Sequence, residues 1–72
     1  MDNKQENRNS YLVTVGGKTR EYPAGITYGE IATVYQKDYP HQIALAVRDG
    51  KIRELFKKVD RDCTVEFLTL TD

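Results

Sequence analysis

The chain has 72 residues, a formal net charge of zero and a single cysteine. Its length allows one small domain, and its balanced charge gives no overall attraction to nucleic acid or to an anionic membrane. Cys63 has no second cysteine to pair with, which is typical of proteins from a reducing cytoplasm.

The first ten residues, 1–10, contain no apolar run. They lack the features of a signal peptide and of a transmembrane segment. We therefore expect a disordered, solvated tail over residues 1–10, followed by one folded domain over residues 11–72.

A hairpin is predicted at the start of this domain. Residues 11–15 are apolar and β-branched enough for a strand, and Gly16-Gly17 supplies the positive φ angles of a tight turn. Residues 18–22 return as the second strand. A two-residue loop places Arg20 opposite Val13, an awkward partner on a core face, whereas a three-residue loop swaps the faces. The sequence leaves both registers open.

The start of a helix is the best-marked boundary in the chain. Thr27 is a good N-cap residue and Glu30 follows three positions later, which completes a capping box. Ile26 and Ile31 occupy the two positions of a hydrophobic staple. Since Pro40 cannot continue the element, we expect a helix of about 11 residues.

One apolar stripe runs along this predicted helix, formed by Tyr28, Ile31, Val34 and Tyr35. A helix so short is unstable alone in water, so it must pack on a sheet. Gly29 lies in its first turn. We interpret it as a merely tolerated glycine, with close backbone packing as the alternative.

A second hairpin follows the helix. Residues 43–48 alternate in character and predict a third strand, whose Leu45 and Val47 we assign to the core. Asp49-Gly50 is a strong type I′ turn signal. Residues 51–55 then return as a short fourth strand.

Residues 63–70 predict the last strand, after a mixed segment, 56–62, that has room for a single helical turn. The order strand, strand, helix, strand, strand defines an α+β domain of the β-grasp (ubiquitin-like) plan, a mixed sheet packed on one helix. The expected core consists of large apolar side chains: Val13, Val15, Tyr22, Ile31, Val34, Tyr35, Leu45, Val47, Leu55, Val65 and Phe67.

The residues that carry chemistry form no catalytic or metal-binding pattern. His41 is interpreted as a surface residue and Cys63 as a small buried hydrophobe, and one histidine with one cysteine cannot close a zinc site. The glycines match no phosphate-binding loop, and the five tyrosines are assigned to core or rim packing rather than to base stacking. We expect no catalytic residue, no metal and no cofactor, and therefore no enzyme activity from this chain by itself.

The basic side chains around the second hairpin are the candidate ligand contacts. Residues 48–62 hold six bases and four acids, a net charge of +2. Lys51, Arg53, Lys57 and Lys58 are the candidates to contact phosphate of RNA or of a nucleotide. The alternative interpretation is an ordinary solvated face tempered by neighbouring acids.

Several short motifs together resemble a TGS domain, the family named for threonyl-tRNA synthetase, certain GTPases and stringent-response enzymes. The resemblance covers about residues 11–72. It rests on the Gly16-Gly17 turn, the Pro23-x-Gly25-x-Thr27 helix entry, the Val47-x-Asp49-Gly50 hairpin that continues to Leu55, and the Thr69-x-x-Asp72 ending.

The wording "GKTREYPAGITYGEIA" and "ALAVRDGKIREL" also resembles the N-terminus of bacterial uridine-kinase-like proteins. Those proteins carry a threonyl-tRNA-synthetase-like region ahead of a P-loop kinase domain. The resemblance implies a regulatory domain of a larger cytoplasmic transferase that binds nucleotide or RNA. It implies downstream domains of the parent enzyme as partners, no membrane, and a monomer for the isolated domain.

Two other functions fit the same fold. A structural docking domain would pack on a neighbouring domain and bind no ligand. A ubiquitin-like modifier or sulfur carrier would need an exposed C-terminal Gly-Gly, but the sequence ends Leu70-Thr71-Asp72 and its Gly16-Gly17 lies in a turn. The modifier is therefore the least favoured of the three.

Overall fold

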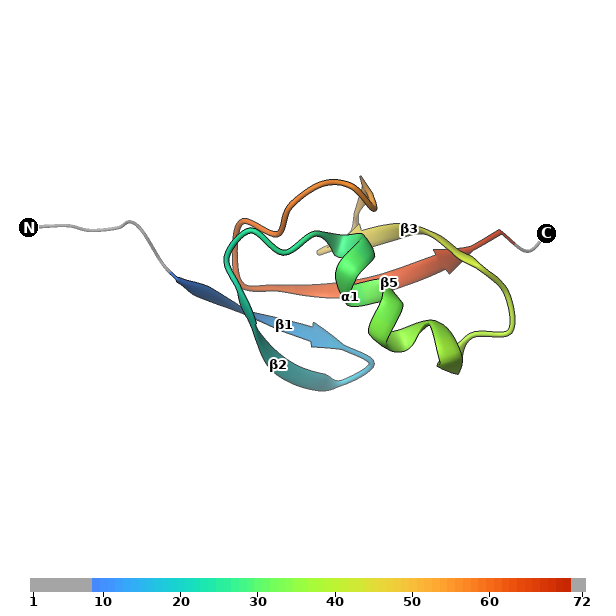
Figure 1. Cartoon of the computed structure of the whole chain (residues 1–72), viewed down its shortest axis with the longest axis horizontal. Coiled ribbons are helices and arrows are strands. Elements are labelled where there is room, and N and C mark those ends of the chain that lie inside the picture. Colours follow the sequence, from blue (N-terminus) through green and yellow to red (C-terminus); the bar gives the residue numbers. More distant parts are fainter. Residues whose placement is uncertain (1–8, 71–72) are drawn as a thin grey trace, which may run out of the picture.

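The computed structural model of the protein describes residues 9–70. The predicted tail lies outside these residues over positions 1–8, as does Asp72 at the end of the TGS-like pattern. The elements follow in the order β1 (Ser10–Val15), β2 (Lys18–Pro23), α1 (Tyr28–Tyr35), the 3₁₀ helix η1 (Gln36–Asp38), β3 (Ile43–Arg48), β4 (Lys51–Glu54) and β5 (Cys63–Thr69) (Figure 1).

The five strands form one mixed sheet in the order β2-β1-β5-β3-β4. β1 and β5 are parallel, and the other neighbouring pairs are antiparallel. α1 packs across one face of this sheet (Figure 1). The predicted α+β fold, a β-grasp-like mixed sheet on one helix, is confirmed. Within residues 9–70 no helix is both long and apolar enough to span a membrane.

The first hairpin has the two-residue loop, which the sequence could not decide. Val15 pairs with Lys18 and Val13 pairs with Arg20, and Gly16 adopts a φ of 61° at the turn. The awkward pair is tolerated because β2 is an edge strand. Val13 is fully buried, while Arg20 is exposed at the margin of the sheet.

The predicted capping box is present at the start of α1. The Glu30 amide donates to the Thr27 hydroxyl at 3.1 Å, and the Thr27 amide donates to the Glu30 carboxylate at 2.9 Å. α1 and η1 together cover residues 28–38, the predicted length.

The buried face of the helix differs from the prediction at one position. Val34 is 47% exposed, whereas Ala32 is 4% exposed. The residues that pack inward are Tyr28, Ile31, Ala32 and, partly, Tyr35. This is the i, i+3, i+4, i+7 spacing of one helix face, and Val34 lies outside it.

The faces of β3 are also reversed relative to the prediction. Ala46 and Arg48 are buried, while Leu45 and Val47 are only half-buried on the face away from α1. The pairing of β3 with β5 shifts register between Ile43 and Leu45. Because this bulge inserts an extra residue, the two-residue alternation that starts at Ile43 does not continue along the strand.

Most of the remaining core follows the prediction. Val65 and Phe67 of β5 are buried, and so is Cys63, as interpreted from the sequence. The prediction missed Val59, which is 2% exposed. The segment between β4 and β5, which had room for a helical turn, contains none: it forms turns and one isolated bridge, between Thr27 and Lys58.

Candidate anion-binding pocket

The segment after β4 is fastened to the entry of α1 by backbone contacts. The Gly29 amide donates to the Leu55 carbonyl at 2.8 Å, and the Tyr28 amide donates to the Lys57 carbonyl at 3.0 Å. The Val59 amide donates in turn to the Ile26 carbonyl at 2.9 Å. These bonds hold the basic residues of this segment beside the first turn of the helix.

Gly29 permits this close approach. A Cβ atom at this position would lie 3.1 Å from the carbonyl oxygen of Leu55 and 3.3 Å from its Cβ. The interpretation of Gly29 as merely tolerated is therefore wrong, and the alternative, close backbone packing, is correct. Gly29 therefore lets the segment after β4 lie directly against the first turn of α1.

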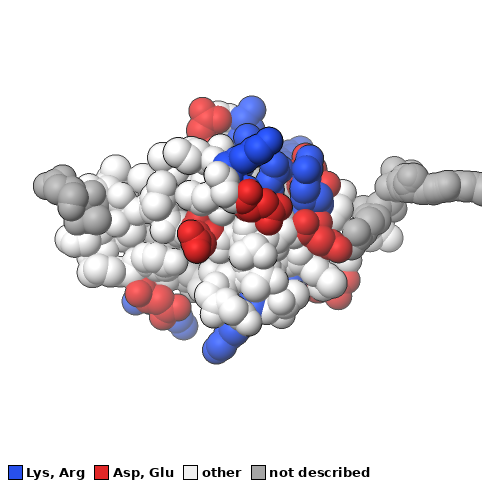
Figure 2. All heavy atoms as spheres, turned by 180° about the vertical axis from the view of Figure 1, so that it is seen from behind, with Lys and Arg blue, Asp and Glu red and all other residues white. Residues whose placement is uncertain are grey.

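A pocket of about 230 Å³ lies where this segment meets α1 and the second hairpin. Its lining combines five cationic side chains with one tyrosine and one carboxylate: Arg48, Arg53, Lys57, Lys58, Arg61, Tyr28 and Asp60. Figure 2 shows Lys and Arg atoms gathered along the upper edge of the molecule, where Figure 1 places the segment between β4 and β5. Acidic atoms border this group.

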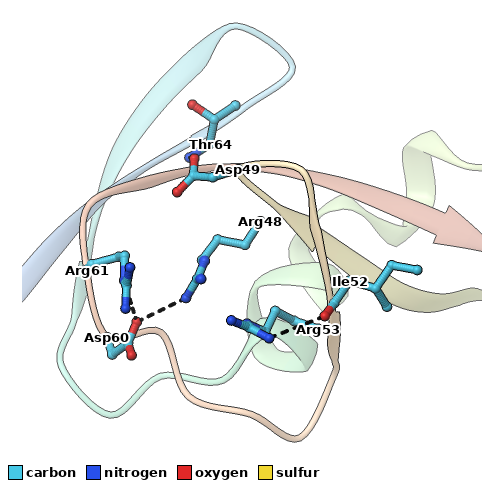
Figure 3. Close-up of polar contacts among 7 residues, drawn as sticks. All are labelled: Arg48, Asp49, Ile52, Arg53, Asp60, Arg61 and Thr64. Carbon is cyan, nitrogen blue, oxygen red and sulfur yellow. Dashed lines mark hydrogen bonds and ion pairs between the residues drawn. The ribbon is translucent and has the colours of Figure 1, made fainter.

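Arg48 is the buried member of the cluster. It is 5% exposed, and its Nη1 lies 3.4 Å from Oδ1 of Asp60. The same carboxylate oxygen accepts from Nε of Arg61 at 3.2 Å, and Asp60 itself is 60% exposed. Figure 3 shows Arg48 and Arg61 both directed at Asp60, with the side chain of Arg53 nearby.

Two buried donors in this pocket have no acceptor within the described residues. They are Nε of Arg48 and the hydroxyl of Tyr28. Burial raises the pKa of Tyr28, and Arg48 partly opposes that rise, first by hydrogen bonding toward the phenol oxygen and then by its positive charge. The phenol is therefore neutral near pH 7 and is available as a hydrogen-bond donor.

The structure gathers three of the four predicted site residues, Arg53, Lys57 and Lys58, at this pocket. Lys51 is exposed on the same hairpin and does not belong to the lining. Sequence reasoning missed Arg48 and Arg61. Both fall in the basic stretch 48–62, but no sequence signal marked the bulge that turns Arg48 inward. A ligand role for any of these side chains stays a prediction.

The side chains of this pocket are suited to binding an anion. Guanidinium and ammonium groups with a phenolic donor provide positive charge and hydrogen bonds directed at oxygen, which is how proteins bind phosphate. Within residues 9–70 no group of three or more His, Cys, Asp or Glu side chains is placed to hold a metal ion. Burial raises the pKa of the free Cys63 thiol, which lowers its reactivity.

Two comparisons with known proteins bear on the family of this chain. No family model matches the chain. The chain is similar to a threonine–tRNA ligase of Symbiobacterium thermophilum, with 34% identity over 56 residues, which is 78% of this chain and 9% of that protein. It therefore spans about a tenth of the length of this relative.

This match, together with the mixed sheet on one helix, supports a TGS-like domain. More particularly, it relates the chain to a small region of a threonine–tRNA ligase. The resemblance to uridine-kinase-like proteins has no counterpart in this match and stays a prediction.

Proposed function

We propose that this chain is a non-catalytic accessory domain of a larger, tRNA-ligase-like enzyme, and that it contacts RNA phosphates through the basic pocket. The observation that carries this proposal is the convergence of five cationic side chains on one pocket that has a single carboxylate among its described lining residues. The similarity to a threonine–tRNA ligase supplies the setting, because such an enzyme acts on RNA.

The size of the pocket favours a phosphate group over a whole nucleotide. Its volume of about 230 Å³ lies below the range of roughly 300–1,000 Å³ that is usual for small-molecule sites. Its lining is cationic, and its one aromatic ring belongs to the buried Tyr28. The pocket therefore recognises charge, while most of a ligand would lie outside it.

The parent enzyme is a separate part of the proposal. We favour a tRNA-ligase-like parent in the cytoplasm, and a uridine-kinase-like parent with a downstream P-loop domain is the alternative. The parent reading frame distinguishes them: a tRNA-ligase core after residue 72 supports the first, and a P-loop motif supports the second.

A titration of the ¹⁵N-labelled domain with tRNA tests the binding claim. We expect shifts of the pocket amides, and an affinity that falls as salt rises, because each phosphate contact releases counterions. The double variant Arg53→Ala/Lys58→Ala should reduce the salt slope by about 1.4 to 1.8. Lys18→Ala, an exposed change in the other hairpin, is the matched control and should leave the slope unchanged. Pocket amides that stay still at low salt would overturn the proposal.

A docking role has one observation in its favour. The face of the sheet away from α1 carries the cross-strand apolar pairs Leu45–Leu68 and Val47–Ile52, and Ile52 is 61% exposed. In this second candidate function, the face packs on a neighbouring domain of the parent enzyme. Ile52→Glu in the full-length enzyme should then increase hydrogen exchange on this face and leave the isolated domain equally stable. Unchanged exchange would exclude the docking role.

A further inference from the structure

Two buried and unpartnered donors meet at the basic pocket. Arg48 and Tyr28 are 5% and 1% exposed, and neither Nε–H of the first nor the O–H of the second has an acceptor within residues 9–70. Buried donors left unpaired cost free energy. A ligand oxygen that reached both donors would remove this cost, so the floor of the pocket is suited to an oxyanion.

Asp60 is the anion that the structure places beside these donors, where it contacts Nη1 of Arg48 and Nε of Arg61. Its carboxylate makes one long contact with Arg48, at 3.4 Å, rather than the paired contacts that a guanidinium forms with a well-placed oxyanion. It lies 60% exposed in the irregular segment between β4 and β5. A phosphate carries more charge than a carboxylate and could displace it without disturbing a strand or a helix.

An exposed aromatic ring lies beside the pocket. Phe56 is 70% exposed, and Nζ of Lys57, a lining residue, lies 5.5 Å from the centre of its ring. An apolar ring held in solvent next to a cationic group is the combination that binds unpaired bases, by stacking on the ring and by charge along the backbone. A duplex would keep its bases inside the helix and out of reach of the ring.

We propose that the pocket clasps one phosphate group of an unpaired RNA nucleotide: the phosphate displaces Asp60 and is bound by Arg48 and Tyr28, and the adjoining base stacks on Phe56. This inference rests on the proposed RNA-binding function and specifies its ligand. The expected ligand is single-stranded or looped RNA, whose phosphate binds in the pocket and whose base stacks at the pocket's rim.

The floor of the pocket is tested with inorganic phosphate. Its binding is followed by the Nε–H signal of Arg48, which should shift on saturation. Tyr28→Phe removes a hydroxyl whose proton has no acceptor and keeps the ring, so the fold should be retained, while phosphate affinity should fall about tenfold. Asp60→Asn should raise phosphate affinity by more than Glu54→Gln, a matched change of an exposed acid outside the pocket lining. Equal affinity for wild type and Tyr28→Phe, or equal gains from the two acid variants, would overturn the clasp.

The stacking step is tested with a short oligouridine, a duplex RNA of the same length and a polyglutamate peptide. The single strand should bind more tightly than the other two. Phe56→Ala should weaken its binding about tenfold and leave inorganic phosphate binding unchanged. Loss of discrimination against the duplex, or tighter binding of the peptide, would exclude the unpaired nucleotide as the ligand.

The RNA-binding function and the phosphate clasp are refuted by different results. Salt-dependent tRNA binding that is insensitive to Tyr28→Phe and Phe56→Ala would refute the clasp and leave the RNA-binding function standing. A pocket that responds neither to phosphate nor to any RNA would refute both.

Discussion

Replacement of Gly29 by alanine tests how tightly the segment after β4 packs on α1. The added Cβ would lie 3.1 Å from the Leu55 carbonyl oxygen and 3.3 Å from the Leu55 Cβ. Both distances are tighter than ordinary van der Waals contact, so the segment after β4 would have to retreat by a few tenths of an ångström. That retreat would stretch the 2.8 Å hydrogen bond from the Gly29 amide to the same carbonyl.

Two opposing effects decide the magnitude. Alanine is a better helix former than glycine, by up to about 1 kcal/mol. Against this stand an overpacking cost of about 1–2 kcal/mol and a weakened hydrogen bond with a net value of about 1 kcal/mol. The carbonyl that receives the contact is backbone and cannot rotate away as a side chain could. We therefore expect Gly29→Ala to destabilise the domain by about 1–2 kcal/mol, or at least about 4 °C in Tm.

Urea denaturation followed by circular dichroism measures this difference. Val34→Ala is the matched control, because it lies in the same helix at a position that is 47% exposed, and we expect it to change stability by less than about 0.5 kcal/mol. Faster amide exchange at Val59, whose amide bonds to Ile26, should accompany the loss. A Gly29→Ala protein as stable as wild type, or more stable, would show that helix propensity outweighs the contact.

Three further predictions concern the core. Phe67→Ala should cost about 3–5 kcal/mol, because the ring is buried and the Tyr35 and Tyr39 rings pack on it at 6.2 and 6.3 Å; a thermal melt with unchanged Tm would contradict this. Cys63 should react with a disulfide reagent at neutral pH far more slowly in the folded protein than in urea, because burial raises its pKa; equal rates would mean an accessible thiolate. Burial also raises the pKa of Tyr22 to about 12 and raises that of Tyr28. Since the folded state then holds these protons more tightly than the unfolded chain, stability should be full below about pH 10 and should fall as the pH approaches 12. Denaturation curves that coincide at pH 9 and pH 11.5 would refute this sign.

The parts of the fold that follow local rules were predictable from the sequence. The capping box needs only Thr27 and Glu30 at the correct spacing, and the glycines of the two turns fix where the hairpins reverse. The register of the first hairpin was undecided because Arg20 seemed unsuited to a core face. The answer depended on β2 being an edge strand, and the position of a strand in the sheet is a property of the whole fold.

The pocket was predictable only in part, for a related reason. Arg53, Lys57 and Lys58 are close in sequence, so their charges could be recognised as a group. Arg48 was assigned to the wrong face because alternation along β3 assumes regular pairing, and the shift in its pairing with β5 is set by a partner distant in the chain. Tyr28 was identified as part of the helix stripe, but its hydroxyl acquires a role only beside Arg48.

The central place of β5 in the sheet has a consequence for biosynthesis. β5 lies between β1 and β3, yet it is the last of these five strands to leave the ribosome. Until it emerges, the nascent chain can form only two separate hairpins, which are marginally stable in water and have unpaired inner edges. Those edges are open to strands of other nascent chains during the interval. On its emergence, β5 therefore pairs with the inner edges of both hairpins and removes this risk of aggregation in a single event. A chain that stops before Cys63 would form two unconnected hairpins rather than a smaller domain.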